Sequence, residues 1–210
     1  MDCIWFYRNQ IVHGSPTIPI DNFIKSALNL FQEHRGAWNE KTSSASFQWT
    51  PPVRGKISVS FDVAVRPFGS TIAAVCRDHL GNILACATNF TKNCNPNNGE
   101  ALAALLGIRI ASEKEWKSIN LEGDSQVVIS ALNNPLNITD WAIEGAIQDS
   151  RTLLRNFDDW KATKIHRDQN RCAHQIAQWA SSNSVFKDIP LNWIHQCLLE
   201  FHSGKDPPSV

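Results

Sequence analysis

The chain has 210 residues, 42% of them hydrophobic and 19% charged, a composition that supports a packed core and excludes global disorder. Lysine and arginine together number 20, as do aspartate and glutamate, so the formal net charge is zero and any binding to nucleic acid must depend on a local basic patch. The six cysteines lack CxxC spacing, which argues against a zinc site built from cysteines alone. No stretch approaches the roughly 18 uninterrupted apolar residues of a membrane span, so we expect no membrane partner.

Residues 1–46 are predicted to form an N-terminal tail and linker rather than a complete domain. Asp21 is a candidate N-cap for one helix over residues 22–33. The dense apolar patterning that follows predicts a single domain over residues 47–182. Residues 183–210 are predicted to be a C-terminal tail.

The first strand of this domain is predicted over residues 56–65, where apolar side chains alternate with small or polar ones. Two further apolar runs, residues 71–76 and 83–88, are separated by a turn that contains Gly81. These three segments predict an antiparallel meander.

Downstream of the meander, helices and strands alternate. Helices are predicted over residues 100–112, 124–132, 140–157 and 170–182, and strands over residues 117–121 and 160–166. Because each of these strands follows a helix, we expect parallel pairing through right-handed crossovers. The order predicts an α/β fold with a mixed five-stranded sheet, whose first three strands are antiparallel, and with helices on both faces.

Three carboxylates stand where predicted elements begin or end. Asp62 lies on the first strand, Glu100 in the first turn of a helix, and Asp124 just after the fourth strand. If the first and fourth strands are neighbours, the three groups meet at one edge of the sheet, where they would repel one another unless a cation lies between them. Oxygen ligands of this kind suit Mg²⁺ or Mn²⁺. For each acid alone a plainer interpretation stays open, solvent exposure for Asp62 and helix capping or dipole compensation for the other two.

Several short segments resemble one family in their order and spacing. They are Trp49 to Pro52, Phe61-Asp62, residues 77–84, Gly99 to Ala104, Leu121 to Ser125 and His166 to His174. Together they make residues 47–182 similar to ribonuclease H-like domains, particularly the domain at the C-terminal end of plant non-LTR retroelement reverse transcriptases and its stand-alone relatives. The resemblance implies a retroelement fragment or a host gene derived from one. It also implies the ribonuclease H fold and metal-dependent cleavage of the RNA strand of an RNA–DNA hybrid, with Mg²⁺ or Mn²⁺ as cofactor.

The resemblance also implies roles for individual residues. Asp62, Glu100 and Asp124 match the first three catalytic, metal-binding acids of the family. The family pattern Asn-Arg-x-Ala-Asp has His174 in place of its final Asp, so His174 is expected to stand in as a metal ligand or a proton acceptor, unless it merely fills a helix face. His166 falls roughly where ribonucleases of this class carry a mobile histidine that assists proton transfer.

Three further features bear on substrate binding. Val63 stands where the family usually has glycine, which is expected to crowd the backbone of the substrate. Four tryptophans fall on apolar stripes and are predicted to be core residues: Trp116, Trp141, Trp160 and Trp179. Six basic residues are candidates for a modest phosphate track: Lys114, Lys117, Lys161, Lys164, Arg167 and Arg171.

Three hypotheses about function stay open. The first is an endonuclease that hydrolyses RNA in RNA–DNA hybrids, and the intact acidic trio favours it. The second is a catalytically impaired nucleic-acid-binding module, and the third is a retroelement remnant or interaction scaffold; His174 and Val63 favour these two. We expect a monomer, and the sequence leaves the compartment, nucleus or cytoplasm, undecided.

Overall fold

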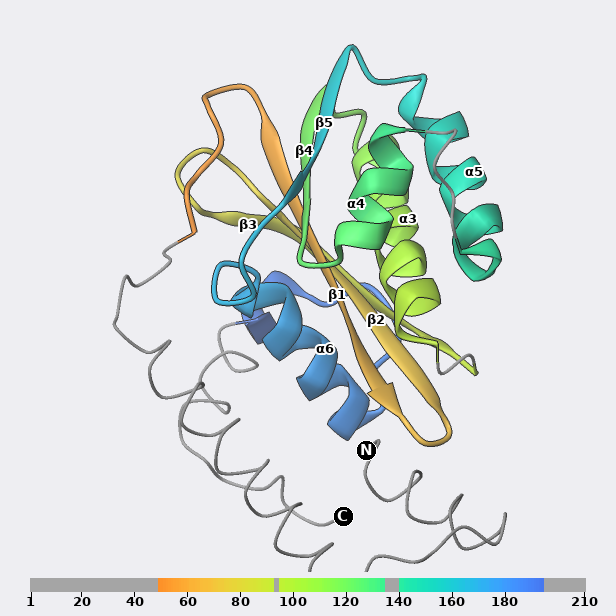
Figure 1. The fold of residues 1–210 in the computed structure, drawn as a ribbon. Helices are drawn as coiled ribbons and strands as arrows, with labels where there is room; N and C mark the ends of the chain where they lie inside the picture. The colour runs from red at the N-terminus through yellow and green to blue at the C-terminus, as the bar shows by residue number, and fades with distance from the viewer. Residues whose placement is uncertain (1–48, 93–94, 135–139, 195–210) are drawn as a thin grey trace, which may run out of the picture. The chain divides into compact units, whose positions relative to one another are not determined.

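The computed structural model describes residues 49–92, 95–134 and 140–194, and the predictions for residues 1–46 lie outside them. The elements follow the predicted order (Figure 1). The strands are β1 (Ile57–Arg66), β2 (Gly69–Arg77), β3 (Ile83–Thr91), β4 (Ser118–Gly123) and β5 (Asp159–Lys164). The helices are α3 (Pro96–Glu113), α4 (Gln126–Asn133), the short 3-10 helix η2 (Trp141–Ile143), α5 (Glu144–Leu154) and α6 (Arg171–Asn183).

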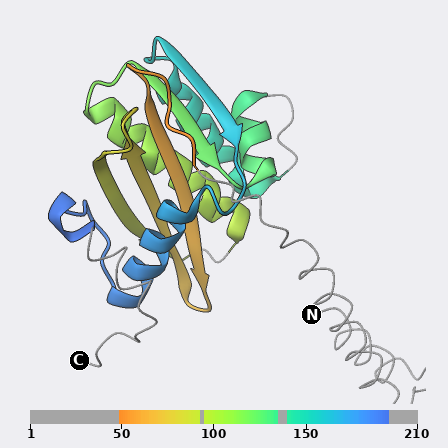
Figure 2. The same ribbon diagram turned by 90° about the vertical axis from the view of Figure 1, so that its left-hand side faces the viewer.

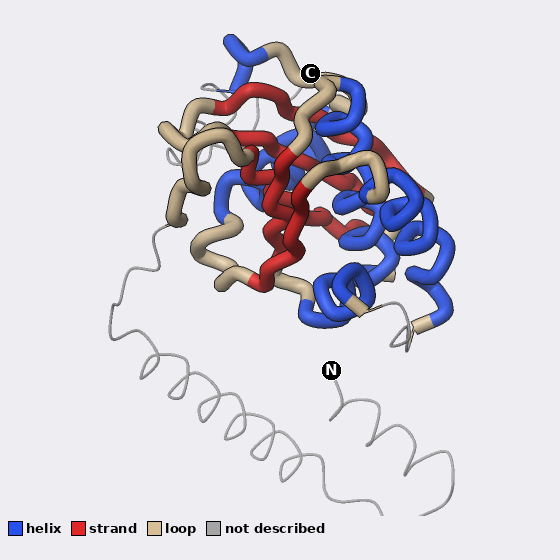
Figure 3. Tube along the Cα trace, turned by 90° about the horizontal axis from the view of Figure 1, so that it is seen from above, coloured by secondary structure: helices blue, strands red, loops and turns tan. Residues whose placement is uncertain are grey.

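The five strands form one sheet in the order β3-β2-β1-β4-β5. The pairs β1–β2 and β2–β3 are antiparallel, whereas β1–β4 and β4–β5 are parallel. Helices α3, α4 and α5 cover one face of the sheet and α6 covers the other (Figures 1 and 2). Seen from above, the strands run through the middle of the domain with helices beside them (Figure 3). The predicted mixed sheet is confirmed.

The two faces of β1 pack against different layers of the domain. Val59 and Phe61 belong to the larger core cluster, which lies between the sheet and helices α3 to α5. A Cβ atom at Gly107 of α3 would lie 2.4 Å from Cγ1 of Val59, so the absence of a side chain lets the helix approach the strand closely. Residues in the other register of β1, among them Asp62, face α6, whose Ile176 belongs to a smaller core cluster.

The predicted start of one helix is wrong by one turn. Helix α3 begins at Pro96 rather than at Glu100, because Asn95 is the N-cap and its Oδ1 accepts a hydrogen bond from the Asn98 amide. Proline in the first helical position strengthens this start, since its missing N–H has no partner to lose there. Glu100 therefore lies beyond the first turn, which contains no acidic residue.

The helix predicted over residues 140–157 is two elements, η2 followed by α5. Asp140 caps the short turn, since its Oδ1 accepts a hydrogen bond from the Ala142 amide. Trp141 lies in that turn and is 87% exposed, so its prediction as a core residue is wrong. The apolar stripe of a continuous helix would have buried it, but the 3-10 turn directs it outward.

The segment after α6 packs against the edge strand β3. The Ile189 amide donates to the Cys86 carbonyl at 2.8 Å, and the Thr88 amide donates to the Lys187 carbonyl at 3.0 Å. Ile189 and Ile194 are each only 4% exposed and join the core cluster beneath α6. Part of the predicted C-terminal tail thus contributes to the domain.

A buried polar network holds the lead-in to β1 against the end of β4. Trp49 Nε1 donates to Glu122 Oε2 at 2.8 Å, and the Ser58 hydroxyl donates to the same oxygen at 2.6 Å. The Arg77 guanidinium lies 3.5 Å from the centre of the Trp49 ring, a cation–π contact. Because Glu122 precedes Asp124 by two residues, the network fixes the strand end that carries this acid.

Among the residues that the structure describes, no helix is both long and apolar enough to cross a membrane.

Candidate metal centre

Strand β1 loses one of its two neighbouring strands just before Asp62. The pairing of β1 with β4 ends at Ser60–Glu122, whereas its pairing with β2 continues to Arg66–Gly69. From Asp62 onward, β1 therefore has no strand on the β4 side, and other groups can approach it there. Asp62 is 5% exposed and is held by a strand that is paired on its other edge.

Glu100 reaches this fork because α3 lies unusually close to β1. A Cβ atom at Gly99 would lie 2.6 Å from Cγ2 of Val63, so only glycine fits this helix position without displacing the valine. The close approach brings the adjacent Glu100 toward Asp62. Val63 points at α3 and is half-buried there, so the direction of its side chain does not support the expected crowding of a substrate backbone.

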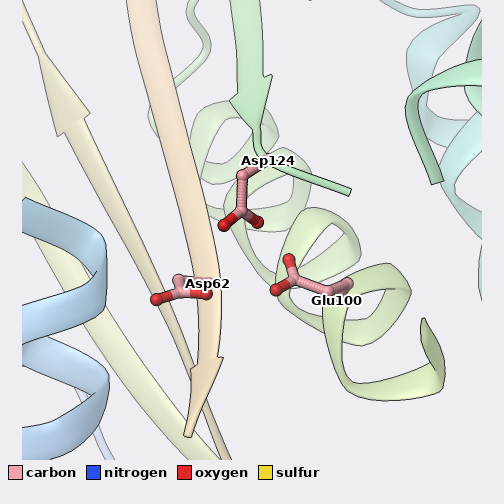
Figure 4. Close-up of side chains that lie close together, drawn as sticks. All are labelled: Asp62, Glu100 and Asp124. Atoms are coloured by element: carbon pink, nitrogen blue, oxygen red, sulfur yellow. The ribbon is translucent and has the colours of Figure 1, made fainter. Parts of the chain in front are cut away.

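Asp124 arrives from the end of β4, in the single residue between Gly123 and the N-cap of α4. The cap is Ser125, whose hydroxyl accepts a hydrogen bond from the Val128 amide. Neither Asp124 nor Glu100 is therefore a helix cap. One ligand atom of each of the three carboxylates lies within 4.8 Å of the others, and Figure 4 shows the groups converging beside β1. The predicted convergence is confirmed.

The trio is electrostatically unfavourable without a cation. Burial raises the pKa of Glu100 well above its usual range, and the neighbouring charge of Asp62 raises it further. Burial and the charge of Asp62 also raise the pKa of Asp124. In addition, Glu100 Oε2 is buried and has no hydrogen-bond partner among the described residues. A divalent cation would supply the missing partner and offset the repulsion.

His174 contacts Asp62 directly. Its Nδ1 lies 2.6 Å from Asp62 Oδ2, and its Nε2 lies 3.4 Å from Nε2 of Gln178 on the next turn of α6. A neutral imidazole that donates from Nδ1 to the carboxylate leaves Nε2 able to accept from the Gln178 amide. The structure thus brings His174 to the site, where it binds an acid of the trio; its role as a metal ligand stays a prediction.

His166 lies in the loop after β5, because this strand ends two residues earlier than the strand predicted over residues 160–166. Its side chain is half-exposed, and Nδ1 lies 3.2 Å from Asp168 Oδ2. The close three-acid cluster does not include it. A role for His166 in proton transfer stays a prediction.

Two residues near the trio received no individual role from the sequence. Asn170 is 1% exposed, and its Nδ2 donates to the Phe61 carbonyl at 2.8 Å, directly before Asp62. Arg167 carries a positive charge that acts on both Glu100 and Asp124. The signal that could have singled out Asn170 is its position before α6, where an asparagine is expected to cap the helix; no such cap bond forms, and the side chain binds the strand instead.

The fold and the acidic cluster together define a class, the ribonuclease H-like domains. The chain belongs to the family described as reverse transcriptase-like, which matches residues 60–180, more than half of its length.

Two relatives carry the name ribonuclease H. Ribonuclease HI of Halobacterium salinarum is 28% identical over 132 residues, which cover 62% of this chain and 66% of that protein. A putative ribonuclease H protein of Arabidopsis thaliana is 26% identical over 201 residues, which cover 86% of this chain and 30% of that protein. The chain therefore spans less than two thirds of either relative.

Solved structures agree with the fold. The crystal structure of ribonuclease H1 from Halobacterium salinarum matches with a TM-score of 0.57 and 26% identity, over 61% of this chain and 98% of that one. The structure of LC11-RNase H1 in complex with an RNA/DNA hybrid matches with a TM-score of 0.53 and 14% identity, over 58% of this chain and 94% of that one. At that identity the second match concerns the fold alone.

Proposed function

We propose that this chain is a divalent-metal-dependent endonuclease that hydrolyses the RNA strand of an RNA–DNA hybrid. The observation that carries the proposal is the acidic trio, three carboxylates with ligand atoms within 4.8 Å of one another at the fork of a ribonuclease H sheet. The relatives named ribonuclease H support the choice of reaction. The hybrid in a structure of the same fold supports the choice of substrate.

The donor set fits Mg²⁺ or Mn²⁺. Carboxylate oxygens are the preferred ligands of these hard cations, and the unpartnered Oε2 of Glu100 and the raised pKa values of Glu100 and Asp124 are features that a bound cation would relieve. We assign Asp62, Glu100 and Asp124 as the ligands, with His174 beside Asp62. Two such ions, when bound, stabilise charge on the attacking and leaving oxygens of a phosphodiester hydrolysis.

The protein's own contribution is to hold these groups in place. The ladder with β2 fixes Asp62, the Gly99–Val63 contact fixes Glu100, and the β4–α4 junction fixes Asp124. His174 orients the Asp62 carboxylate through Nδ1. Such fixed ligands lower the reorganisation that accompanies the reaction.

A second candidate function is a catalytically impaired module that binds the hybrid without cleaving it. The bond between His174 and Asp62 favours it, because it engages a carboxylate oxygen that a cation would otherwise use. Where the family pattern supplies an acid, this chain supplies a neutral or positively charged group, which lowers the affinity for cations.

Cleavage of an end-labelled RNA–DNA hybrid, measured with Mg²⁺ and with Mn²⁺, distinguishes the two. We expect weak cleavage by the wild type, none by Asp62→Asn, and an increase of about tenfold or more for His174→Asp, because the added carboxylate strengthens cation binding. Glu113→Gln, at the far end of α3, is the matched control and should cleave like the wild type. Hybrid binding without cleavage in every variant would select the second function.

A further inference from the structure

The loop between β5 and α6 is attached on both sides of the acidic trio. At its start, the Ile165 amide donates to the Gly123 carbonyl at 2.9 Å, directly before Asp124. At its end, Asn170 Nδ2 donates to the Phe61 carbonyl at 2.8 Å, directly before Asp62. The four residues between these anchors therefore lie next to the cluster, and the anchors fix their distance from it.

The loop is also held by bonds within itself. The Gln169 amide donates to the His166 carbonyl at 2.9 Å, and the Gln169 side chain accepts from the His166 amide at 3.0 Å. The Asn170 amide donates to the Arg167 carbonyl at 3.1 Å. A turn with this many bonds presents its side chains from a defined position, which lowers the entropy lost when one of them binds a ligand.

Arg167 is the one arginine or lysine among the four residues that the two anchors hold beside the acidic trio. Its side chain is exposed, and within the described part of the chain its guanidinium makes no hydrogen bond or ion pair. The donors of this group therefore remain available to a ligand.

Three of the other five basic candidates are placed less favourably. Lys114 and Lys117 precede β4, whereas Asp124 follows it, and a strand of this length separates the two ends by about 20 Å. Arg171 lies beyond the second anchor, in the first turn of α6. Lys114 and Lys117 therefore do not continue a track from Arg167, and Arg167 is the candidate that lies within the anchored loop.

We propose that Arg167 binds a phosphate of the nucleic-acid backbone next to the phosphodiester that is cleaved. This assignment rests on the proposed function, since the substrate is taken to be an RNA–DNA hybrid. A phosphate must approach a cluster of carboxylates, and a guanidinium beside the cluster offsets the repulsion while matching two phosphate oxygens with parallel N–H donors. Arg167 is in this sense a substrate-positioning residue.

A purely structural role would have a different signature. If Arg167 served only to reduce repulsion among the acids, its removal would alter the trio and the stability of the fold but leave hybrid binding unchanged. The test therefore measures hybrid binding and cation binding separately. Fluorescence anisotropy with a labelled RNA–DNA hybrid in EDTA reports the first without cleavage, and calorimetric titration with Mn²⁺ alone reports the second.

The variants are Arg167→Ala and Arg167→Lys, with Arg171→Ala as the matched control four residues away. We expect Arg167→Ala to weaken hybrid binding about tenfold at low salt and to reduce the slope of log K against log salt by about one. Lysine should restore part of the affinity, and Arg171→Ala should change it less than twofold. Binding of Mn²⁺ to Arg167→Ala should be unchanged or tighter, because a nearby positive charge has been removed.

Equal hybrid affinities and salt slopes for Arg167→Ala and Arg171→Ala would overturn the assignment while leaving the proposed function intact. Weaker binding of Mn²⁺ by Arg167→Ala would also overturn it, since Arg167 would then act by arranging the acids. Absence of hybrid binding by the wild-type protein would reject the hybrid as substrate and the role of Arg167 together. Thermal melting of each variant verifies that the fold is retained.

Discussion

Replacing Glu100 by Gln should change how the stability of the metal-free protein depends on pH. In the unfolded chain this carboxyl titrates near its usual value of 4.5, whereas burial and the charge of Asp62 raise its pKa in the folded protein. Folding therefore takes up a proton at any pH between these two values, so the contribution of Glu100 to stability is largest at low pH and falls as pH rises. Asp124, whose pKa is also raised, contributes in the same direction.

The size of the effect follows from linkage. While the folded carboxyl keeps its proton and the unfolded one has lost it, the free energy of unfolding falls by about 1.4 kcal/mol per pH unit. Between pH 5.5 and 7.5 the wild type should thus lose about 3 kcal/mol relative to Glu100→Gln, which is roughly 6–12 °C in melting temperature for a domain of this size. Saturating Mg²⁺ should reduce this difference, because the cation stabilises the ionised form of the wild-type carboxyl.

The assay is thermal melting in EDTA at a series of pH values, repeated with Mg²⁺. The difference in melting temperature between the wild type and Glu100→Gln isolates this carboxyl, because all other side chains are the same in the two proteins. Glu113→Gln removes an exposed carboxylate from the other end of α3 and should melt in parallel with the wild type. If the melting temperatures of the wild type and Glu100→Gln changed in parallel with pH, the inference that folding raises the pKa of Glu100 would be refuted.

Two further substitutions test the supports of the site. Gly99→Ala places a methyl group where Cγ2 of Val63 lies 2.6 Å away, so it should cost about 1–3 kcal/mol in urea unfolding and reduce hybrid cleavage, with partial recovery when Val63→Ala is added. No loss of stability in Gly99→Ala would contradict the close helix–strand contact. Trp49→Phe keeps the ring but removes the donor to Glu122 Oε2, so it should cost about 1–3 kcal/mol by the same measurement, whereas an unchanged midpoint would show that the lead-in is not anchored there.

The sheet and the acidic trio were predictable because their signals are local and periodic. Alternation along β1 identifies a strand with one apolar face, and helices between the later strands require parallel crossovers. Given that order, Asp62 and Asp124 must approach each other where β4 ends. The sequence also held the signal for the true start of α3, since Asn95-Pro96 is a strong cap, but the predicted start at Glu100 missed it.

The features that sequence reasoning missed depend on contacts between distant segments. Nothing within residues 165–170 indicates that Asn170 bonds to Phe61, because this contact arises only when α6 packs on β1. Trp141 was wrongly predicted to be buried because the prediction assumed one continuous helix with an apolar stripe. Helix α5 begins three residues after Trp141, so this residue does not lie on that stripe.

Asp62 is the residue on which the two candidate functions depend, because its neighbours compete for its carboxylate. On one side it contributes an oxygen to the cluster with Glu100 and Asp124, and on the other its Oδ2 is bound by His174. A protonated His174 neutralises one charge of the trio and weakens its attraction for cations, whereas a neutral His174 orients the carboxylate without reducing its charge. Replacing His174 by Asp removes the group that binds Asp62 Oδ2 and adds a carboxylate, so His174→Asp should need less Mg²⁺ for half-maximal cleavage than the wild type. If His174 merely filled a helix face, the two proteins would need the same concentration of Mg²⁺.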